Sequence, residues 1–154
     1  MPNLFNVDFV EFLELLASHK VDYLLVGGYA VILHGYVRST GDLDLWINKT
    51  SDNYKKLKEV YNDFGAPIFS ENEFLSNDYD VWSIGKEPNK IEILSEVKGL
   101  SFDESSSVCQ WFSLENFKVP FIDFEDLIKA KLASGRFKDL ADIEYLKELK
   151  KRKD

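Results

Sequence analysis

The sequence predicts an α/β fold, and three observations predict it. A β-rich run at residues 22–26 ends in the pair Gly27-Gly28. A second apolar strand at 42–47 carries two aspartates one residue apart. Apolar side chains recur at helical spacing before, between and after these strands. Helices and strands therefore alternate along the chain, which is typical of α/β and α+β domains.

The first half of the chain contains predicted helices at 8–19, 29–34 and 52–63 and predicted strands at 22–26 and 42–47. Asp8 is the expected N-cap of the first helix, because Glu11 follows three residues later as in a capping box. The short second helix starts at the glycine pair. Thr50-Ser51 can cap the third helix, and Gly65 ends it.

The second half is less regular. It contains predicted strands at 79–85, 90–94, 108–113 and 117–122 and predicted helices at 124–134 and 138–149. The turn at 86–89 joins the first two of these strands into a hairpin. Pro120 restricts the strand at 117–122 to a sheet edge. Residues 70–75 form a short helix or a loop.

The two C-terminal helices carry clear signals of their own. Asp123 can cap the helix at 124–134, and Gly135 breaks it. The apolar residues expected to face inward from the final helix are Leu140, Ile143, Leu146 and Leu149.

Size and composition favour a single domain over residues 1–154. With 154 residues and 45% hydrophobic residues the chain can bury a real core. The single Cys109 excludes an internal disulfide framework and fits a reducing compartment. No secretory signal precedes the first helix, and the most apolar window, 23–37, is too short to span a bilayer. We therefore expect a soluble, cytoplasmic protein without a membrane anchor.

The net charge argues against extensive electrostatic binding of nucleic acid. The formal net charge is −8, whereas nucleic-acid binding normally needs a basic surface. A local basic patch is still compatible with this value, and we find no strong nucleic-acid signature.

The strand at 42–47 carries the residues with the clearest chemistry. Side chains alternate faces along a strand, so Asp42 and Asp44 are expected on one face. Two carboxylates there repel each other unless a cation lies between them, and hard oxygen ligands suit Mg²⁺ or Mn²⁺. Gly27 and Gly28 let the backbone approach an anion such as phosphate. This combination suggests phosphoryl or nucleotidyl transfer.

With these residues the chain resembles the nucleotidyltransferase-fold superfamily, which also contains polymerase-beta-like enzymes. Its mark is an apolar residue and a Gly-Gly or Gly-Ser pair, then an apolar-flanked Asp-x-Asp and a third carboxylate on a later strand. Val26-Gly27-Gly28, Asp42-Leu43-Asp44 and Glu92 match these three parts. The run from Arg38 through Thr40 to Asp44 is similar to the Arg-x-Thr-x-Asp-Ile-Asp signature of a bacterial branch. That branch includes abortive-infection toxin nucleotidyltransferases and small stand-alone relatives.

The C-terminal segment adds a second match. Lys131, followed by Arg136-x-Lys138-Asp139 and Asp142, resembles the "Lys…Arg-x-Lys-Asp-x-x-Asp" segment of the same branch. The two segments together bracket residues 22–146. The resemblance implies a mixed β-sheet flanked by helices, with two C-terminal helices and an active site at the end that holds Gly27 and Asp42.

The resemblance also implies an activity, which is transfer of a nucleoside monophosphate from a nucleoside triphosphate (NTP) to an acceptor. Asp42, Asp44 and Glu92 would be the catalytic residues and would hold two Mg²⁺ or Mn²⁺ ions. The residues expected to bind the nucleotide are Gly27, Gly28, Arg38, Thr40, Lys131 and Asp139.

Each assignment has a plainer alternative. Asp42 and Asp44 could face solvent on an edge strand, and Asp80 could replace Glu92 as the third carboxylate. Arg38 could pair with a surface carboxylate, and Lys131 could be solvated. Lys138, Asp139 and Asp142 could form caps and surface pairs at the start of the last helix. His34 fits a core or rim position better than a ligand role.

The acceptor is not specified by the sequence, because the family modifies small molecules, proteins and tRNA ends. The charge of −8 makes tRNA the weaker candidate. An alternative function is a catalytically weak protein that keeps the fold and binds a nucleotide or a partner. A third hypothesis is a toxin silenced by a cognate antitoxin.

Overall fold

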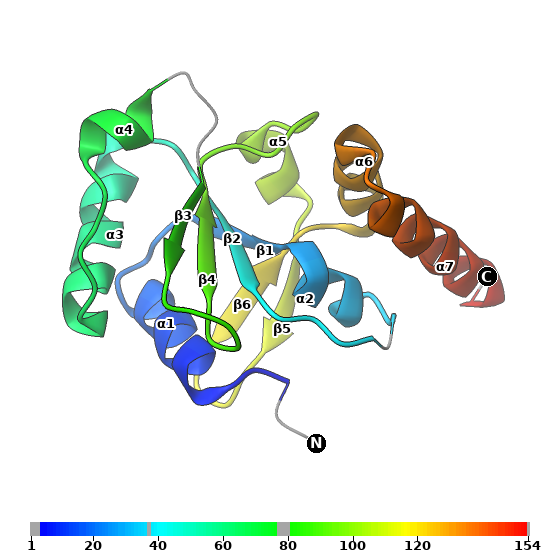
Figure 1. Cartoon of the computed structure of the whole chain (residues 1–154), viewed down its shortest axis with the longest axis horizontal. Coiled ribbons are helices and arrows are strands. Elements are labelled where there is room, and N and C mark those ends of the chain that lie inside the picture. The colour runs from blue at the N-terminus through cyan, green and yellow to red at the C-terminus, as the bar shows by residue number, and fades with distance from the viewer. Residues whose placement is uncertain (1–3, 37, 77–80, 154) are drawn as a thin grey trace.

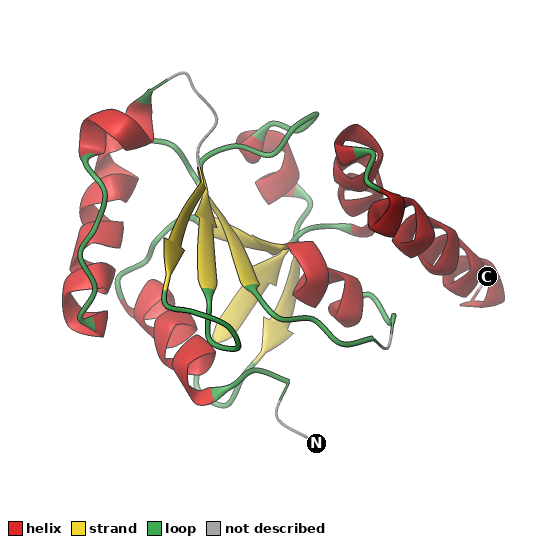
Figure 2. Ribbon diagram, in the orientation of Figure 1, coloured by secondary structure: helices red, strands yellow, loops and turns green. Residues whose placement is uncertain are grey.

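The computed structural model describes residues 4–36, 38–76 and 81–153. Six strands form one sheet in the order β3-β4-β2-β1-β6-β5 (Figures 1 and 2). The strands are β1 (Tyr23–Val26), β2 (Leu43–Ile47), β3 (Val81–Ile84), β4 (Ile91–Leu94), β5 (Gln110–Ser113) and β6 (Lys118–Phe121). The helices are α1 (Val7–Ser18), α2 (Gly27–Leu33), α3 (Ser51–Phe64), α4 (Glu71–Leu75), α5 (Phe102–Ser107), α6 (Phe124–Ser134) and α7 (Phe137–Lys153).

The sheet is mixed, and its pairing brings distant segments together. β1 pairs antiparallel with β2 and parallel with β6, and β2 pairs parallel with β4. β3 and β5 complete the two edges by antiparallel pairing. Since β1 runs opposite to β2 and β4, the carboxyl end of β1 and the amino ends of β2 and β4 meet at the same end of the sheet.

Alternation along the strands builds a core on each face of the sheet. Tyr23 and Leu25 face the core under α1, α3 and α4. Leu24 and Val26 face the second core, which α2, α6 and α7 cover. Both faces are therefore buried, and Figure 1 shows α7 extending from this second layer to the C-terminus.

The predicted α/β class, the mixed sheet and the two C-terminal helices are confirmed. Helix α3 begins after the N-cap Thr50, and α6 begins after Asp123; each ends at its predicted glycine. The hairpin of β3 and β4 forms as predicted. Part of the strand predicted at 79–85 lies outside the described residues, and so does Asp80.

Several predictions about elements were wrong or incomplete. The N-cap of α1 is Asn6, whose side chain accepts from the Phe9 backbone N–H, so Asp8 lies within the first turn. Asp42 precedes β2 rather than lying within it. Helix α5 was not predicted, and α7 is longer than 138–149 and leaves Leu140 exposed. Asp139 and Asp142 take the buried positions at the start of α7 instead.

Pro120 does not limit β6 to an edge, because β6 lies between β1 and β5. The pairing with β1 involves a single residue pair, Leu25 with Phe121. The missing N–H of proline therefore interrupts little of the sheet.

No helix in the described ranges is both long and apolar enough to cross a membrane.

Candidate active site

Three carboxylates lie at the end of the sheet where β1 stops and where β2 and β4 start. Asp44 on β2 and Glu92 on β4 are register partners in the parallel pair, so their side chains leave the same face side by side. Asp42 lies two residues before Asp44, just ahead of β2. The structure thus brings together the three catalytic candidates predicted from the sequence.

Burial and neighbouring negative charges raise the pKa of both aspartates. Burial raises the pKa of Asp44 to about 7, and the negative charges of Glu92 and Asp42 add to the shift. Burial, followed by the charge of Glu92, also raises the pKa of Asp42. Such mutual repulsion favours binding of a cation between these groups.

A lysine that the sequence did not single out partly supplies that cation. Lys90 Nζ lies 3.0 Å from Glu92 Oε1 and 3.9 Å from Asp42 Oδ2. The Lys90 backbone carbonyl accepts a hydrogen bond from the N–H of Leu43, the residue between Asp42 and Asp44 in the sequence, and this bond fixes the Lys90 backbone beside β2. Lys90 directly precedes β4 and has no motif of its own, so no sequence signal indicated its role.

The donor set fits a hard divalent cation. All three side chains offer carboxylate oxygens, the ligands that Mg²⁺ and Mn²⁺ prefer. Asp42 Oδ1 is buried and has no hydrogen-bond partner in the described part of the chain, which leaves a lone acceptor for an ion. In those same residues, no three His, Cys, Asp or Glu side chains form a preassembled metal cluster. Ion binding would therefore require these side chains to converge and Lys90 to move.

The glycine pair lies directly against this group. Gly27 has φ +70°, and a Cβ on it would overlap with the Asp44 carboxylate. A Cβ on Gly28 would overlap with the Thr40 hydroxyl and lie 3.5 Å from Arg38 Nη2. Both positions thus require the absence of a side chain, which also exposes backbone at the first turn of α2.

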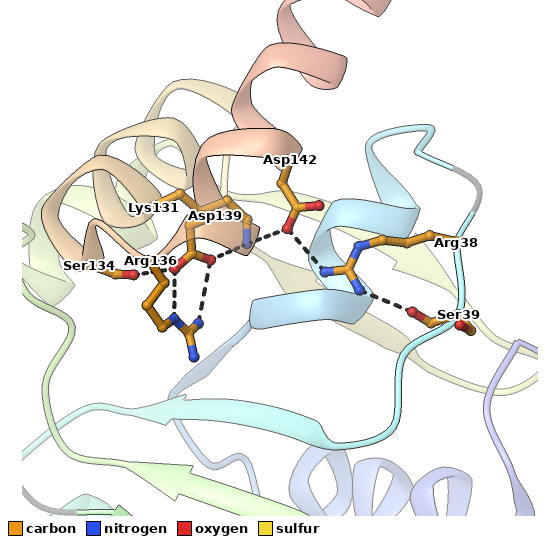
Figure 3. A network of polar contacts seen from close by, with 7 residues as sticks. All are labelled: Arg38, Ser39, Lys131, Ser134, Arg136, Asp139 and Asp142. Carbon is orange, nitrogen blue, oxygen red and sulfur yellow. Dashed lines mark hydrogen bonds and ion pairs between the residues drawn. The ribbon is translucent and has the colours of Figure 1, made fainter.

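A network of charged side chains joins α6 and α7 to the segment before β2 (Figure 3). Asp142 Oδ2 lies 3.1 Å from both Arg38 Nη2 and Lys131 Nζ. Lys131 Nζ also lies 3.2 Å from Asp139 Oδ1. Lys131, Asp139 and Asp142 are all buried, so the plainer readings of a solvated lysine and of surface pairs are wrong.

The Asp139 carboxylate accepts further hydrogen bonds. Arg136 Nε donates to it at 2.7 Å, and the Ser134 hydroxyl donates as well. Burial acts to raise the pKa of Asp139, but the hydrogen bonds from Arg136, Ser134 and Lys131 outweigh it and hold the pKa at about 2. Asp139 is therefore charged across the physiological range.

A cavity of about 650 Å³ connects the carboxylates to this network. Asp44 and Glu92 line one part of it, and Lys131 and Arg136 line another. The side chain of Arg136 is 74% exposed, and its charge acts to lower the pKa of Asp44, so the two groups interact across the site. The volume is in the range of small-molecule sites.

Five of the nine predicted site residues line this cavity, and four lie beside it. The lining residues are Gly27, Asp44, Glu92, Lys131 and Asp139; the others are Gly28, Arg38, Thr40 and Asp42. Lys98 and Arg136 also line it, although neither was predicted as a site residue. The "Arg-x-Lys-Asp" segment was a signal for Arg136. His34 is a rim residue, bonded through Nε2 to the carbonyl of Ile122.

This mixed sheet, with a glycine pair and carboxylates at one end, defines a nucleotidyltransferase fold. A family model described as "Nucleotidyltransferase of unknown function (DUF6036)" matches residues 3–152, and the chain belongs to this family. The predicted superfamily is confirmed, and the chain is an enzyme of the nucleotidyltransferase class. No curated protein matches the sequence.

Two solved structures share the fold. The lincosamide antibiotic adenylyltransferase LnuA, solved with lincomycin bound, is 19% identical with a TM-score of 0.56, and the match covers 94% of this chain and 98% of that one. A candidate nucleotidyltransferase from Thermotoga maritima is 15% identical with a TM-score of 0.58, and the match covers 91% of each chain. At these identities the likeness concerns the fold.

Proposed function

We propose that this enzyme transfers a nucleoside monophosphate from an NTP to a small-molecule acceptor, with two divalent ions, Mg²⁺ or Mn²⁺. One observation carries the proposal: a single cavity of about 650 Å³ is lined by Asp44 and Glu92 and also by Lys131 and Arg136. Carboxylates suit the metal ions, and the basic groups suit the triphosphate that the ions accompany.

Asp42, Asp44 and Glu92 would hold the ions. When bound, such ions neutralise triphosphate charge and lower the pKa of an acceptor hydroxyl. Two observations support this assignment. Asp42 Oδ1 is a buried acceptor without a hydrogen-bond partner among the described residues, and the raised pKa of Asp44 reflects burial beside other negative charges. Glu92 would be a ligand or would accept the acceptor's proton.

The triphosphate would lie against the first turn of α2. Gly27 and Gly28 offer backbone there without side chains, and Thr40 adds a hydroxyl beside Gly28. Lys131 and Arg136 would neutralise phosphate charge from the other side of the cavity. Asp139 would hold these two cations in place by its hydrogen bonds to both.

Arg38 would act from beside the cavity. Its Nε is a buried donor that has no acceptor among the described residues, and an unsatisfied buried donor is costly. A phosphate oxygen is one group that could satisfy it, and Arg38 Nη2 already lies close to the Gly28 backbone.

A small-molecule acceptor is supported by the likeness to LnuA and by the net charge. LnuA, which shares the fold, is an adenylyltransferase for a lincosamide antibiotic, and the match covers 98% of its chain. A net charge of −8 does not favour a polyanionic acceptor such as tRNA.

The test is thermal melting with each of the four NTPs, in Mg²⁺ and in EDTA. A ligand at a hundredfold excess over its Kd stabilises by about 2.7 kcal/mol, which raises Tm by several degrees. We expect a Mg²⁺-dependent rise with at least one NTP, which would identify the donor. The absence of a rise with all four NTPs would contradict the proposal and favour a protein that keeps the fold without binding a donor.

A further inference from the structure

Helix α7 touches the segment before β2 at two places. Asp142 bonds to Arg38 at 3.1 Å, and the Tyr145 ring stacks on the Tyr36 ring with centroids 4.0 Å apart. Asp142 and Tyr145 are three residues apart on a helix and therefore lie on the same face. Both contacts hold the chain that leads into Asp42.

Regular secondary structure does not fix the part of this segment nearest Asp42. Residues 38–40 belong to no helix or strand, so side-chain contacts contribute to where they lie. Yet Thr40 packs on Gly28, and Arg38 Nη2 lies 3.5 Å from the position that a Cβ on Gly28 would occupy. Contacts made by α7 thus bear on the position of groups at the glycine pair.

The same carboxylate also holds a cation in the cavity. Asp142 Oδ2 is shared by Arg38 and Lys131, whose side chains are 14% and 8% exposed. If that negative charge were lost, the largely buried cations of Arg38 and Lys131 would no longer share a carboxylate that offsets their repulsion. They would then separate or lose their present orientation.

We propose that Asp142, assisted by Tyr145, is a positioning residue that sets Arg38 and Lys131 for triphosphate binding. The inference rests on the proposed function in one respect, which is that a triphosphate binds at the glycine pair. It extends that function by giving α7 a role at the site of the NTP donor, where the helix positions two cationic side chains. Asp142 itself touches no substrate in this scheme; it acts through the two cations.

The experiment compares wild type, Asp142→Asn and Tyr145→Ala, with Glu144→Gln as the matched control. Glu144 is an exposed carboxylate on α7 between the two residues tested. For each protein we would measure Kd for the best-binding Mg²⁺-NTP, Kd for the corresponding monophosphate, and Kd for Mn²⁺ alone. Hydrogen exchange at the amides of residues 38–42 would be followed without nucleotide.

We expect Asp142→Asn to raise Kd for the triphosphate at least tenfold, with changes within twofold for the monophosphate and for Mn²⁺. Exchange at 38–42 should accelerate. Tyr145→Ala should accelerate exchange as well, with a smaller rise in Kd, and Glu144→Gln should match wild type. A lower Tm with unchanged triphosphate Kd and unchanged exchange would overturn the inference, because Asp142 would then be structural only.

The two proposals can fail separately. If wild type binds no triphosphate, the proposed function is wrong, and the exchange data still decide whether α7 fastens the segment. If Asp142→Asn does not fold, Tyr145→Ala decides, since Tyr145 is 42% exposed and its truncation leaves the core intact. Wild-type exchange at 38–42 in Tyr145→Ala would then overturn the positioning role.

Discussion

Asp44 and Glu92 occupy the same register position on the parallel strands β2 and β4. Two carboxylates that lie side by side cannot both ionise without cost. Burial and the charge of Glu92 raise the pKa of Asp44 to about 7, so the metal-free site retains a proton near neutral pH. Several properties of the protein should depend on this pair.

The stability of the metal-free protein should fall as pH rises. The pKa of Asp44 is about 7 in the folded protein, against an ordinary value of 3.8. The folded state therefore binds the extra proton, and this contribution is fully present below about pH 4 and is lost as pH rises through about 7. Melting in EDTA between pH 5 and 8 should show a declining Tm.

The variant Asp44→Asn should remove most of this pH dependence. Glu59→Gln, an exposed change on α3, should leave it as in wild type. An equal slope of Tm against pH in Asp44→Asn and in wild type would assign the dependence to other groups.

Asp44→Asn should also separate stability from metal binding. At pH 8 the amide should stabilise the metal-free fold by about 1–3 kcal/mol, because the pKa of Asp44 is raised to about 7 and one pKa unit corresponds to about 1.4 kcal/mol. Mn²⁺ binding, followed by calorimetry, should be lost. Wild-type Mn²⁺ affinity in this variant, or in Asp42→Asn with Asp44→Asn, would contradict the metal assignment.

Gly27→Ala should damage the site more than its backbone strain alone predicts. Gly27 and Gly65 both have positive φ, +70° and +90°, but a Cβ meets Asp44 at the first and nothing within 4 Å at the second. Gly65→Ala should therefore cost about 1–2 kcal/mol and leave Mn²⁺ binding intact. Gly27→Ala should cost more and weaken Mn²⁺ binding at least tenfold; similar behaviour of the two variants in denaturant and metal titrations would refute the packing argument.

Lys90→Met should tighten divalent-ion binding. The ammonium of Lys90 lies between Glu92 and Asp42, so an entering ion has to displace it. Without it the metal-free protein should melt lower at pH 8, while Kd for Mn²⁺ should fall several-fold. Lys86→Met, an exposed change in the same turn, serves as the control. Weaker Mn²⁺ binding in Lys90→Met would show that the lysine supports the ion site instead of competing for it.

Elements with their own boundary signals were predictable from the sequence. Thr50 and Gly65 bound α3 as expected, because capping is a local property of a few residues. Local signals could not predict the pairing of Asp44 with Glu92, because parallel strands join segments far apart in sequence. Only the family resemblance linked these two residues, and Lys90 has no comparable signal.

The start of α7 shows why helical periodicity failed there. Leu140 was expected inside, yet it is exposed, and Asp139 and Asp142 are buried in its place. A charged side chain can be buried when it meets matching charges, and the partners Lys131 and Arg38 come from α6 and from the segment before β2. Periodicity reads apolar residues along one helix and does not detect such partners.

The close fit of Gly27 against Asp44 has a consequence for how relatives of this chain can diverge. A lineage that acquires any side chain at position 27 has to abandon the aspartate's present position, and a lineage that has lost the aspartate no longer needs the glycine. The two positions should therefore drift together. Their joint retention or joint loss offers a simple way to separate family members that keep the chemistry from those that have given it up.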